Sequence, residues 1–298
     1  MSVGKEPFSS GPEVASGIVT VAQPTVYYDS DQNRRPLITE FRNFWRYRGL
    51  IKLLVVRQLT VRYKRSVLGV WWTVLNPILT IAVLWVIFSN FFGRGGTLDE
   101  PYIVYLSAGI LLSTYFVQGV NSTGASIINS RNILVKMYLP PEIFALVTAL
   151  AAAANFILSL VPLFLLQLLT GVGIPWTVIL VPLPLVTMLM FVTGIGLLIA
   201  SAAVYFRDVL DITRVLTSLV NFLIPTFWTI GILEGKSALI LVENNPVYSY
   251  LVSFRNLVYQ GVIPERRFLI MMVVSSVVAL MLGVYVFSRN WRRVVVRL

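Results

Sequence analysis

Residues 56–77 read VRQLTVRYKRSVLGVWWTVLNP, and this stretch changes character at its midpoint. Four of its first ten residues are basic, and no charged residue then follows Arg65 until Arg94. This charge-free window exceeds the about 20 apolar residues that cross the hydrocarbon core of a bilayer. We therefore expect a membrane-spanning helix at residues 67–93, bent at Asn76-Pro77 and preceded directly by a basic segment.

The composition of the whole chain also indicates a membrane protein. Hydrophobic residues make up 57% of the 298 residues and charged residues only 12%, about half the charged share of an average soluble domain. The chain has no cysteine and no histidine, which excludes thiolate nucleophiles, Cys or His metal ligands and imidazole chemistry. Its net charge of +11 does not indicate nucleic acid as a partner, because basic residues in membrane proteins set orientation.

Charge-poor windows predict an all-α membrane protein with six spans. The expected spans are 67–93, 102–121, 143–170, 177–205, 215–233 and 268–288. The third and fourth share a window of 64 residues without charge, divided by the sequence from Gly171 to Pro175. Within the fourth span, Gly194-Ile195-Gly196 indicates close helix packing rather than a dinucleotide-binding loop.

The chain is expected to divide into four regions. These are a polar, disordered tail at 1–40, an amphipathic helix at 41–66, a six-span domain at 67–290 and a basic C-terminus at 291–298. Lys and Arg collect before the first span, after the second and fourth, and after the sixth, so both termini are expected in the cytoplasm. The segment at 234–267 is the exception, since its four basic residues fall on the predicted outer side: Lys236, Arg255, Arg266 and Arg267.

The segment at 41–66 has a basic and an apolar side when it is drawn as a helix. The basic stripe comprises Arg42, Arg46, Arg57 and Lys64, and the opposite, apolar stripe comprises Phe41, Phe44, Ile51, Val55 and Leu59. Arg48 and Lys52 fall on the apolar side and do not fit this pattern. The segment is expected to lie in the cytoplasmic interface, with its basic side toward lipid headgroups or a partner and its apolar side toward the acyl chains. A simple positive-inside anchor explains the same residues equally well.

Polar residues inside the predicted spans are neutral, which argues against an ion-coupled carrier. They are Asn76, Gln118, Asn121, Asn155, Gln167 and Asn221. Most are expected to bond between helices, and some could line a path for an uncharged, hydroxylated substrate. The sequence GILEGKS at 231–237 lacks one residue of a phosphate-binding loop and follows no predicted strand, so we expect no ATP site there.

A short helix is expected between spans five and six. Asn245 is placed to cap it, Pro246 to occupy its first position and Gly261 to end it. This helix is too short and too charged to span, so it should lie on the outer surface or re-enter the outer leaflet.

Three motifs occur in order along the six-span layout: RYKRSVLGVWWTVLNP at 62–77, LPPE at 139–142 and YFRD at 205–208. Together they resemble the membrane permease of ABC polysaccharide exporters, the type 2 exporter superfamily that handles O-antigens, teichoic acids and cell-wall galactan. The resemblance covers about residues 41–298, although Pro141 stands where the family often has a basic or apolar residue.

The resemblance implies a multi-pass permease of the bacterial inner membrane. Two copies would pair around a channel for a lipid-linked polysaccharide, with galactan as the nearest likeness, and separate cytoplasmic ATPase subunits would bind ATP and Mg. This chain itself would carry no cofactor, metal or catalytic site.

The resemblance also implies roles for individual residues. Coupling to the ATPase would involve Arg131, Lys136, Pro140, Pro141, Glu142, Arg207 and Asp208. The interface helix would present Arg57, Arg62, Tyr63, Lys64 and Arg65. The aromatic candidates for the channel lining are Trp71, Trp72, Trp85, Phe88, Tyr115, Phe116, Phe227, Trp228, Tyr248 and Tyr250.

Two other functions fit part of the sequence. An exporter of a smaller lipid or drug from the same superfamily would share the six spans, but the basic run before the first span favours the polysaccharide branch. A membrane scaffold or glycan-modifying enzyme is the second alternative. An enzyme would have to use Glu142, Asp208 or Asp211, the only acids predicted near a cytoplasmic span end.

Overall fold

The computed structural model describes residues 47–63, 66–69, 71–91, 102–134, 139–233, 235 and 237–297. The chain forms two units, Met1–Asn33 and Arg34–Leu298. The predicted tail at 1–40 lies outside the described residues, as do residues 41–46 of the predicted interface helix. Within the described ranges all regular secondary structure is helical, which confirms the all-α prediction.

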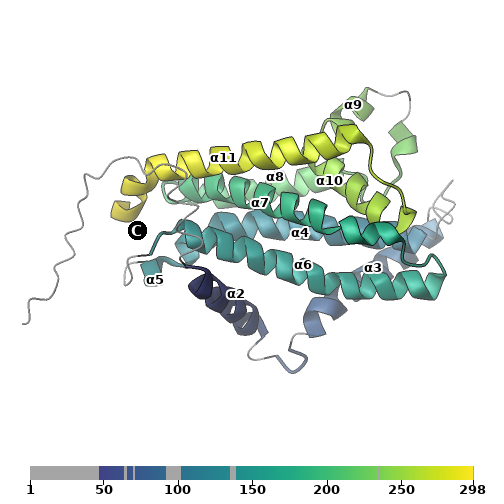
Figure 1. Cartoon of the computed structure of the whole chain (residues 1–298), viewed down its shortest axis with the longest axis horizontal. Helices are drawn as coiled ribbons and strands as arrows, with labels where there is room; N and C mark the ends of the chain where they lie inside the picture. The colour runs from purple at the N-terminus through teal and green to yellow at the C-terminus, as the bar shows by residue number, and fades with distance from the viewer. Residues whose placement is uncertain are drawn as a thin grey trace, which may run out of the picture. The chain divides into compact units, whose positions relative to one another are not determined.

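Five helices in the described part of the chain are long and apolar enough to cross a membrane. They are α3 (Trp71–Phe91), α4 (Tyr102–Asn129), α6 (Glu142–Thr170), α7 (Pro182–Ala203) and α11 (Arg266–Arg297). Figure 1 shows α4, α6, α7 and α11 running alongside one another as the body of the bundle. Their sequence positions match five of the six predicted spans.

Glycine and proline set the boundary between the third and fourth spans, as the sequence predicted. Gly171 ends α6 in the left-handed conformation, with φ of 75°, which glycine adopts without steric cost. The 3₁₀ helix η1 (Trp176–Leu180) follows, and Pro182 then begins α7, where its missing N–H has no helical partner to lose.

The predicted fifth span at 215–233 is wrong as a continuous helix. Helix α8 (Asp208–Leu223) ends two residues before Pro225, and Ile224 is extended, with φ of −83° and ψ of 140°. A proline disfavours helical geometry in the residue before it and removes a helical hydrogen bond. The 16 residues of α8 span about 24 Å, less than the about 30 Å of a bilayer core. Residues 224–229 and the 3₁₀ helix η2 (Ile230–Leu233) continue the chain beyond the break.

The predicted helix after this segment is present, and its termini are as expected. Between η2 and this helix lies α9 (Ala238–Glu243). In α10 (Pro246–Arg255), the Asn245 side chain accepts a hydrogen bond from the Val247 N–H at 3.0 Å. The π-helical turn η3 (Asn256–Gln260) extends α10 to Gly261, whose φ is 69°. Because Tyr250 and Phe254 are fully buried, α10 packs inside the bundle, as a re-entrant helix would, rather than on its surface.

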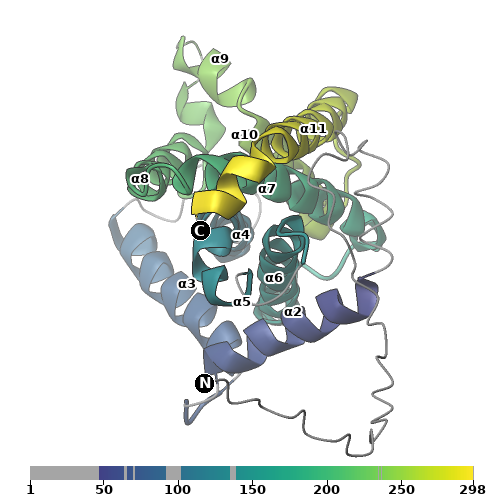
Figure 2. The ribbon, with the colours of Figure 1, turned by 90° about the vertical axis from the view of Figure 1, so that its left-hand side faces the viewer.

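Helix α2 (Arg48–Tyr63) lies across one end of the bundle, against α6 (Figure 1, Figure 2). Its Ile51 is buried against Ile143 and Val147 of α6, with Val55 packed beside them. Along residues 51–55 the apolar side of this segment therefore packs against the protein's own α6 and not against the acyl chains that the sequence predicted. Lys64 and Arg65 lie outside the described residues.

Helices α7 and α11 approach each other closely through two glycines. A Cβ on Gly194 would lie 2.3 Å from the backbone of Ala279, and one on Gly283 would lie 2.3 Å from the Gly194 carbonyl oxygen. Small residues allow helices to approach this closely in membranes. The packing role predicted for the Gly194 segment is confirmed.

Candidate functional site

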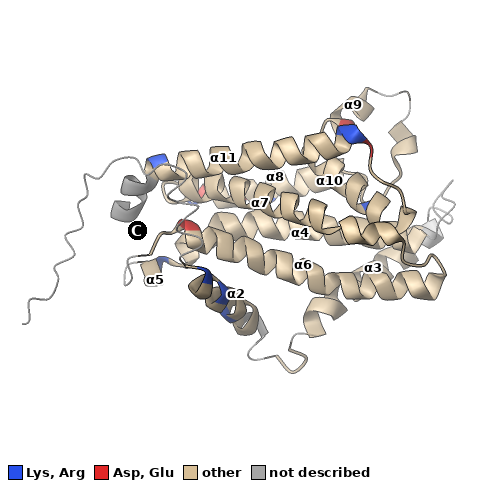
Figure 3. Ribbon diagram, viewed as in Figure 1, with Lys and Arg blue, Asp and Glu red and all other residues tan. Residues whose placement is uncertain are grey.

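Charged residues lie mostly toward the two ends of the bundle in the part of the chain that the structure describes (Figure 3). One end contains α2, the short helix α5 (Arg131–Leu134), the starts of α6 and α8 and the last turns of α11. The predicted coupling residues that the structure describes belong to this end: Arg131, Pro140, Pro141, Glu142, Arg207 and Asp208. Arg57 is exposed on α2, whereas the side chains of Arg62 and Tyr63 are not among those described.

The two predicted coupling segments meet in one hydrophobic cluster. Ile133 of α5, Leu139 and Val204 all pack against a buried group formed by Ile127, Phe144, Ala145, Leu197, Ala200 and Phe287. Leu54 of α2 packs against the same group. Protein interiors are close-packed. A displacement of any of these segments would therefore be transmitted directly to helices α4, α6, α7 and α11.

The polar residues around this cluster have different environments. Arg131, Arg207 and Asp208 are exposed, whereas Pro141 is buried at the start of α6. Glu142 and Asp208 occupy the first turns of α6 and α8, where a negative charge is favourable. Lys136 lies outside the described residues. This end thus presents charge on its surface and apolar side chains beneath it.

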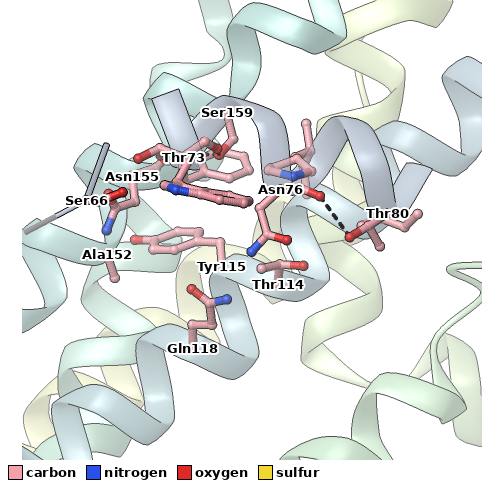
Figure 4. Close-up of a pocket in the computed structure, with 15 residues that line it drawn as sticks. Ser66, Thr73, Asn76, Thr80, Thr114, Tyr115, Gln118, Ala152, Asn155 and Ser159 are labelled. Atoms are coloured by element: carbon pink, nitrogen blue, oxygen red, sulfur yellow. Dashed lines mark hydrogen bonds between the residues drawn. The ribbon is translucent and has the colours of Figure 1, made fainter. Parts of the chain in front are cut away.

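A second candidate site is a polar cavity of about 520 Å³ between α3, α4 and α6 (Figure 4). It is lined by Ser66, Trp72, Thr73, Asn76, Pro77, Thr80, Ile110, Leu111, Thr114, Tyr115, Gln118, Ala152, Asn155, Phe156 and Ser159. The structure brings together three of the six predicted intramembrane amides, one from each helix: Asn76, Gln118 and Asn155. Among the described residues that line the cavity, none is charged.

The polar cavity has an exposed mouth and a buried floor. Asn76, Thr80, Thr114 and Gln118 are exposed, an arrangement that hydrocarbon would disfavour because their polar groups would lose hydrogen bonds. At the floor, the Tyr115 hydroxyl and the Asn155 Oδ1 are buried, and no described group bonds to either. Such atoms are normally satisfied by a partner, water or ligand. The cavity therefore suits a water-filled or ligand-filled path better than a lipid-facing surface.

The other three predicted amides have different places. Asn121 donates to the Thr217 hydroxyl of α8 at 3.0 Å, and Gln167 donates to the Val258 carbonyl at 3.1 Å. These two bond between segments, as expected for most such residues. Asn221 lies on α8, away from the cavity lining.

The ten aromatic candidates for the channel lining separate into groups. Trp72 and Tyr115 line the polar cavity, and Tyr115 stacks on Phe156 with ring centroids 5.0 Å apart. Trp71 and Trp85 are exposed on α3, and Phe88 stacks on Phe227 at 5.9 Å. Phe116, Tyr248 and Tyr250 are buried in the chain's own core, with Trp228 packed partly against it. Phe116, Tyr248, Tyr250 and Trp228 thus contact the chain's own core, and their contact with a substrate remains a prediction.

Sequence analysis missed a polar cluster centred on Arg255. This side chain is only 5% exposed, although it was counted as a loop charge. Its guanidinium donates to the carbonyl oxygens of Pro225 at 2.8 Å, Thr226 at 3.2 Å and Tyr105 at 3.1 Å. It also lies 3.5 Å from the centre of the Tyr105 ring, a favourable cation–π contact.

Two tyrosines of α4 also form hydrogen bonds with backbone carbonyls in the irregular segment after α8. The Tyr105 hydroxyl lies 3.0 Å from the Pro225 oxygen and 2.7 Å from the Trp228 oxygen, and the Tyr102 hydroxyl donates to the Phe227 oxygen at 2.7 Å. Four consecutive carbonyls, 225–228, thus accept side-chain hydrogen bonds. We call Tyr102, Tyr105, Arg255 and these carbonyls the carbonyl node. The only sequence sign of it was a lone arginine in the aromatic, otherwise uncharged helix α10.

Comparisons with known proteins agree with this architecture. A family model described as ABC-2 type transporter matches residues 49–259. An O-antigen export system permease protein RfbA from Myxococcus xanthus is 28% identical over 253 residues, covering 85% of this chain and 96% of that protein. A protein of the same name from Klebsiella pneumoniae is 23% identical over 248 residues, covering 80% of this chain and 92% of that protein. Since the family match covers more than half of the chain, this protein belongs to the ABC-2 type transporter family as an exporter permease.

Proposed function

We propose that two copies of this chain form an inner-membrane channel that exports a lipid-linked polysaccharide. Separate ATPase subunits would bind ATP and Mg in the cytoplasm and drive export. The observation that carries the proposal is the similarity to O-antigen export permeases over nearly their whole length. Cell-wall galactan is the narrower proposal for the glycan and rests on the sequence resemblance alone.

The polar mouth on α3 and α4 supports a channel function. Asn76, Thr114 and Gln118 expose hydrogen-bonding groups within helices that are otherwise apolar enough to span. Contacts of α4 with both α3 and α8 place these two helices beside it. Helix α8 exposes an apolar row that suits lipid or the second copy: Ile212, Val215, Leu216, Leu219, Phe222 and Leu223.

The structure of the end that contains α2, α5 and the starts of α6 and α8 supports the proposal of an ATPase partner on the cytoplasmic side. Described residues of two predicted coupling segments, Ile133, Leu134 and Leu139 in one and Val204 in the other, pack against one buried cluster that includes residues of α4, α6, α7 and α11. When an ATPase moves against these segments, the membrane-spanning helices would move with them as rigid bodies. Arg131, Glu142, Arg207 and Asp208 are proposed as the described contacts, with Lys136 as a further one.

Co-purification with a candidate ATPase subunit tests this proposal. We expect a complex of two permeases and two ATPases in detergent, and loss of substrate-stimulated ATP hydrolysis in Glu142→Arg. Glu265→Arg makes the same charge change at an exposed position at the opposite end of the bundle and should leave the rate unchanged. A permease that purifies without any ATPase would contradict the proposal.

The two alternatives can be separated in the same preparation. Stimulation of ATP hydrolysis by a small lipid or drug, and not by lipid-linked glycan, would favour the smaller-substrate exporter. A glycan-modifying enzyme would lose its product in Asp208→Asn while ATP hydrolysis stayed coupled.

A further inference from the structure

We propose that the polar cavity between α3, α4 and α6 binds one neutral sugar ring of the exported glycan. This inference rests on the proposed function and narrows it, because it names a binding site within a single copy of the chain. The cavity volume of about 520 Å³ falls in the range of about 300–1,000 Å³ that is usual for ligand pockets.

The lining selects against charged ligands. The hydrogen-bonding groups of its described lining residues are amides, hydroxyls and an indole, and none of these described residues is acidic or basic. An anionic sugar placed there would lose water without gaining an opposite charge, which is costly in a membrane interior. Neutral hydroxyl groups both donate and accept hydrogen bonds, and amides and hydroxyls match them in both roles.

The floor of the cavity supplies unused hydrogen-bonding capacity. The Tyr115 hydroxyl and the Asn155 Oδ1 have no partner in the described structure. Two hydroxyls of the lining already donate within their own helices, Ser159 to the Asn155 carbonyl at 2.9 Å and Thr80 to the Asn76 carbonyl at 2.9 Å. The buried groups without a partner thus come from two helices, α4 and α6, and a ring seated between them could bond to both.

Aromatic rings give the cavity its apolar surface. Trp72, Tyr115 and Phe156 line it, and the last two are stacked. A pyranose ring combines apolar C–H faces with a polar rim of hydroxyls, so flat rings and amides together fit it. An acyl chain would leave the amides unpaired. The hollow between α2, α6 and α7 has a mainly apolar lining that includes Ile157, Leu185, Val186 and Leu189, with Arg48 and Lys52 of α2 also in it.

Single-cysteine labelling provides the test, because the natural chain contains no cysteine. Thr114→Cys places a thiol at the exposed mouth of the cavity, and Ser237→Cys places one at an exposed site outside it. The full chain, in lipid nanodiscs, is reacted with a water-soluble maleimide in the presence of a neutral hexose tetrasaccharide or a hexuronic acid tetrasaccharide. Gln118→Cys replaces Thr114→Cys if that variant does not fold.

We expect the neutral sugar to slow labelling at residue 114 about tenfold at about ten times its Kd. The acidic sugar should not protect residue 114, and neither sugar should protect residue 237. In the Thr114→Cys background, Tyr115→Phe and Asn155→Leu should each raise the Kd about tenfold, the effect of one lost hydrogen bond. Asn221→Leu, an intramembrane amide outside the cavity, is the matched control and should leave the Kd unchanged.

Three results would overturn the inference. They are no protection by the neutral sugar, equal protection by both sugars, and a thiol that never reacts because lipid fills the cavity. If the permease and ATPase together still export glycan in these cases, only the cavity assignment fails. If the cavity binds sugar but no ATPase assembles, the sugar site stands and the exporter proposal fails.

Discussion

The carbonyl node and the polar cavity are two polar regions of one helical bundle, and they differ in how their hydrogen-bond acceptors are satisfied, although Arg255 Nε in the node also has no partner among the described groups. In the node, four backbone carbonyls freed by the break at Pro225 all have side-chain partners. In the cavity, the Tyr115 hydroxyl and the Asn155 Oδ1 have none among the described groups. Both regions use helix α4, so the difference lies in the partners and not in the supporting element.

This difference separates polar groups that hold a structure from polar groups that are available to a ligand. Irregular backbone within a membrane protein must be satisfied by protein or water, and the node satisfies it with protein. A buried polar atom without a protein partner lowers stability unless something else bonds to it. Substitutions in the node should therefore reduce stability, whereas substitutions at the cavity floor should reduce binding.

Replacement of Arg255 by methionine should have the largest effect. Methionine keeps much of the buried volume but removes the guanidinium donors to Pro225, Thr226 and Tyr105, so we expect a loss of about 3 kcal/mol in unfolding free energy. Arg267→Met is the control, because Arg267 forms an exposed ion pair with Glu243 at 3.2 Å, worth about 0–1 kcal/mol. Thermal unfolding in detergent, followed by circular dichroism, measures both; equal losses would remove the node's special role.

A methyl group at Gly109 should disturb the node from the side of α4. A Cβ there would lie 2.5 Å from Arg255 Nη2 and 2.9 Å from the Thr226 carbonyl oxygen. We expect Gly109→Ala to cost about 2 kcal/mol through overpacking. Gly49→Ala has open space around it and should be neutral or slightly stabilising. An unchanged unfolding temperature for Gly109→Ala would mean that Arg255 can leave its position without loss.

Tyr105→Phe should have a smaller effect on stability. The substitution keeps the ring beneath Arg255 but removes the hydroxyl that bonds to Pro225 and Trp228, which should cost about 1 kcal/mol. Tyr285→Phe, at an exposed tyrosine of α11, serves as the control. The same unfolding measurement decides the result, and a neutral Tyr105→Phe would show that water replaces the hydroxyl in the node.

Tyr115→Phe should change stability least, although it is the same substitution on the same helix. Because the Tyr115 hydroxyl has no described partner, its loss should alter the unfolding free energy by less than about 0.5 kcal/mol or even stabilise the protein. Export should nevertheless slow, since the hydroxyl is proposed to bond to sugar. Paired unfolding and export assays of Tyr105→Phe and Tyr115→Phe compare the two regions most closely. If Tyr115→Phe lowered stability but left export normal, the Tyr115 hydroxyl would hold the structure and would not bind sugar.

Features fixed by local chemistry could be predicted from the sequence. Asn245 and Pro246 begin α10 and Gly261 ends its π-helical extension, because capping and positive φ depend on residues close in the chain. The division of α6 from α7 at Gly171 and Pro182 has the same origin. The fifth span was predicted too long, because the hydropathy of the sequence continues beyond Pro225. Helix α8 ends before this proline, which disfavours helical geometry in the preceding residue.

Features that depend on packing between distant segments could not be predicted. Arg255 looked like an outer loop charge, since its burial requires contacts 150 residues away at Tyr105. Asn76, Gln118 and Asn155 line one cavity because of how three helices are rotated about their own axes. A periodic apolar pattern does not specify these rotations. The sequence nevertheless pointed to neutral polar residues as the relevant set.

Transport in a reconstituted system is the most direct test of the exporter assignment. The permease and its ATPase subunit would be placed in sealed vesicles with the ATPase outside, and labelled lipid-linked polysaccharide would be added to the outer leaflet. The account predicts ATP-dependent arrival of the glycan inside the vesicles, and its loss in Glu142→Arg but not in Glu265→Arg. Arrival of glycan at the same rate without ATP, or equal loss in both variants, would contradict it.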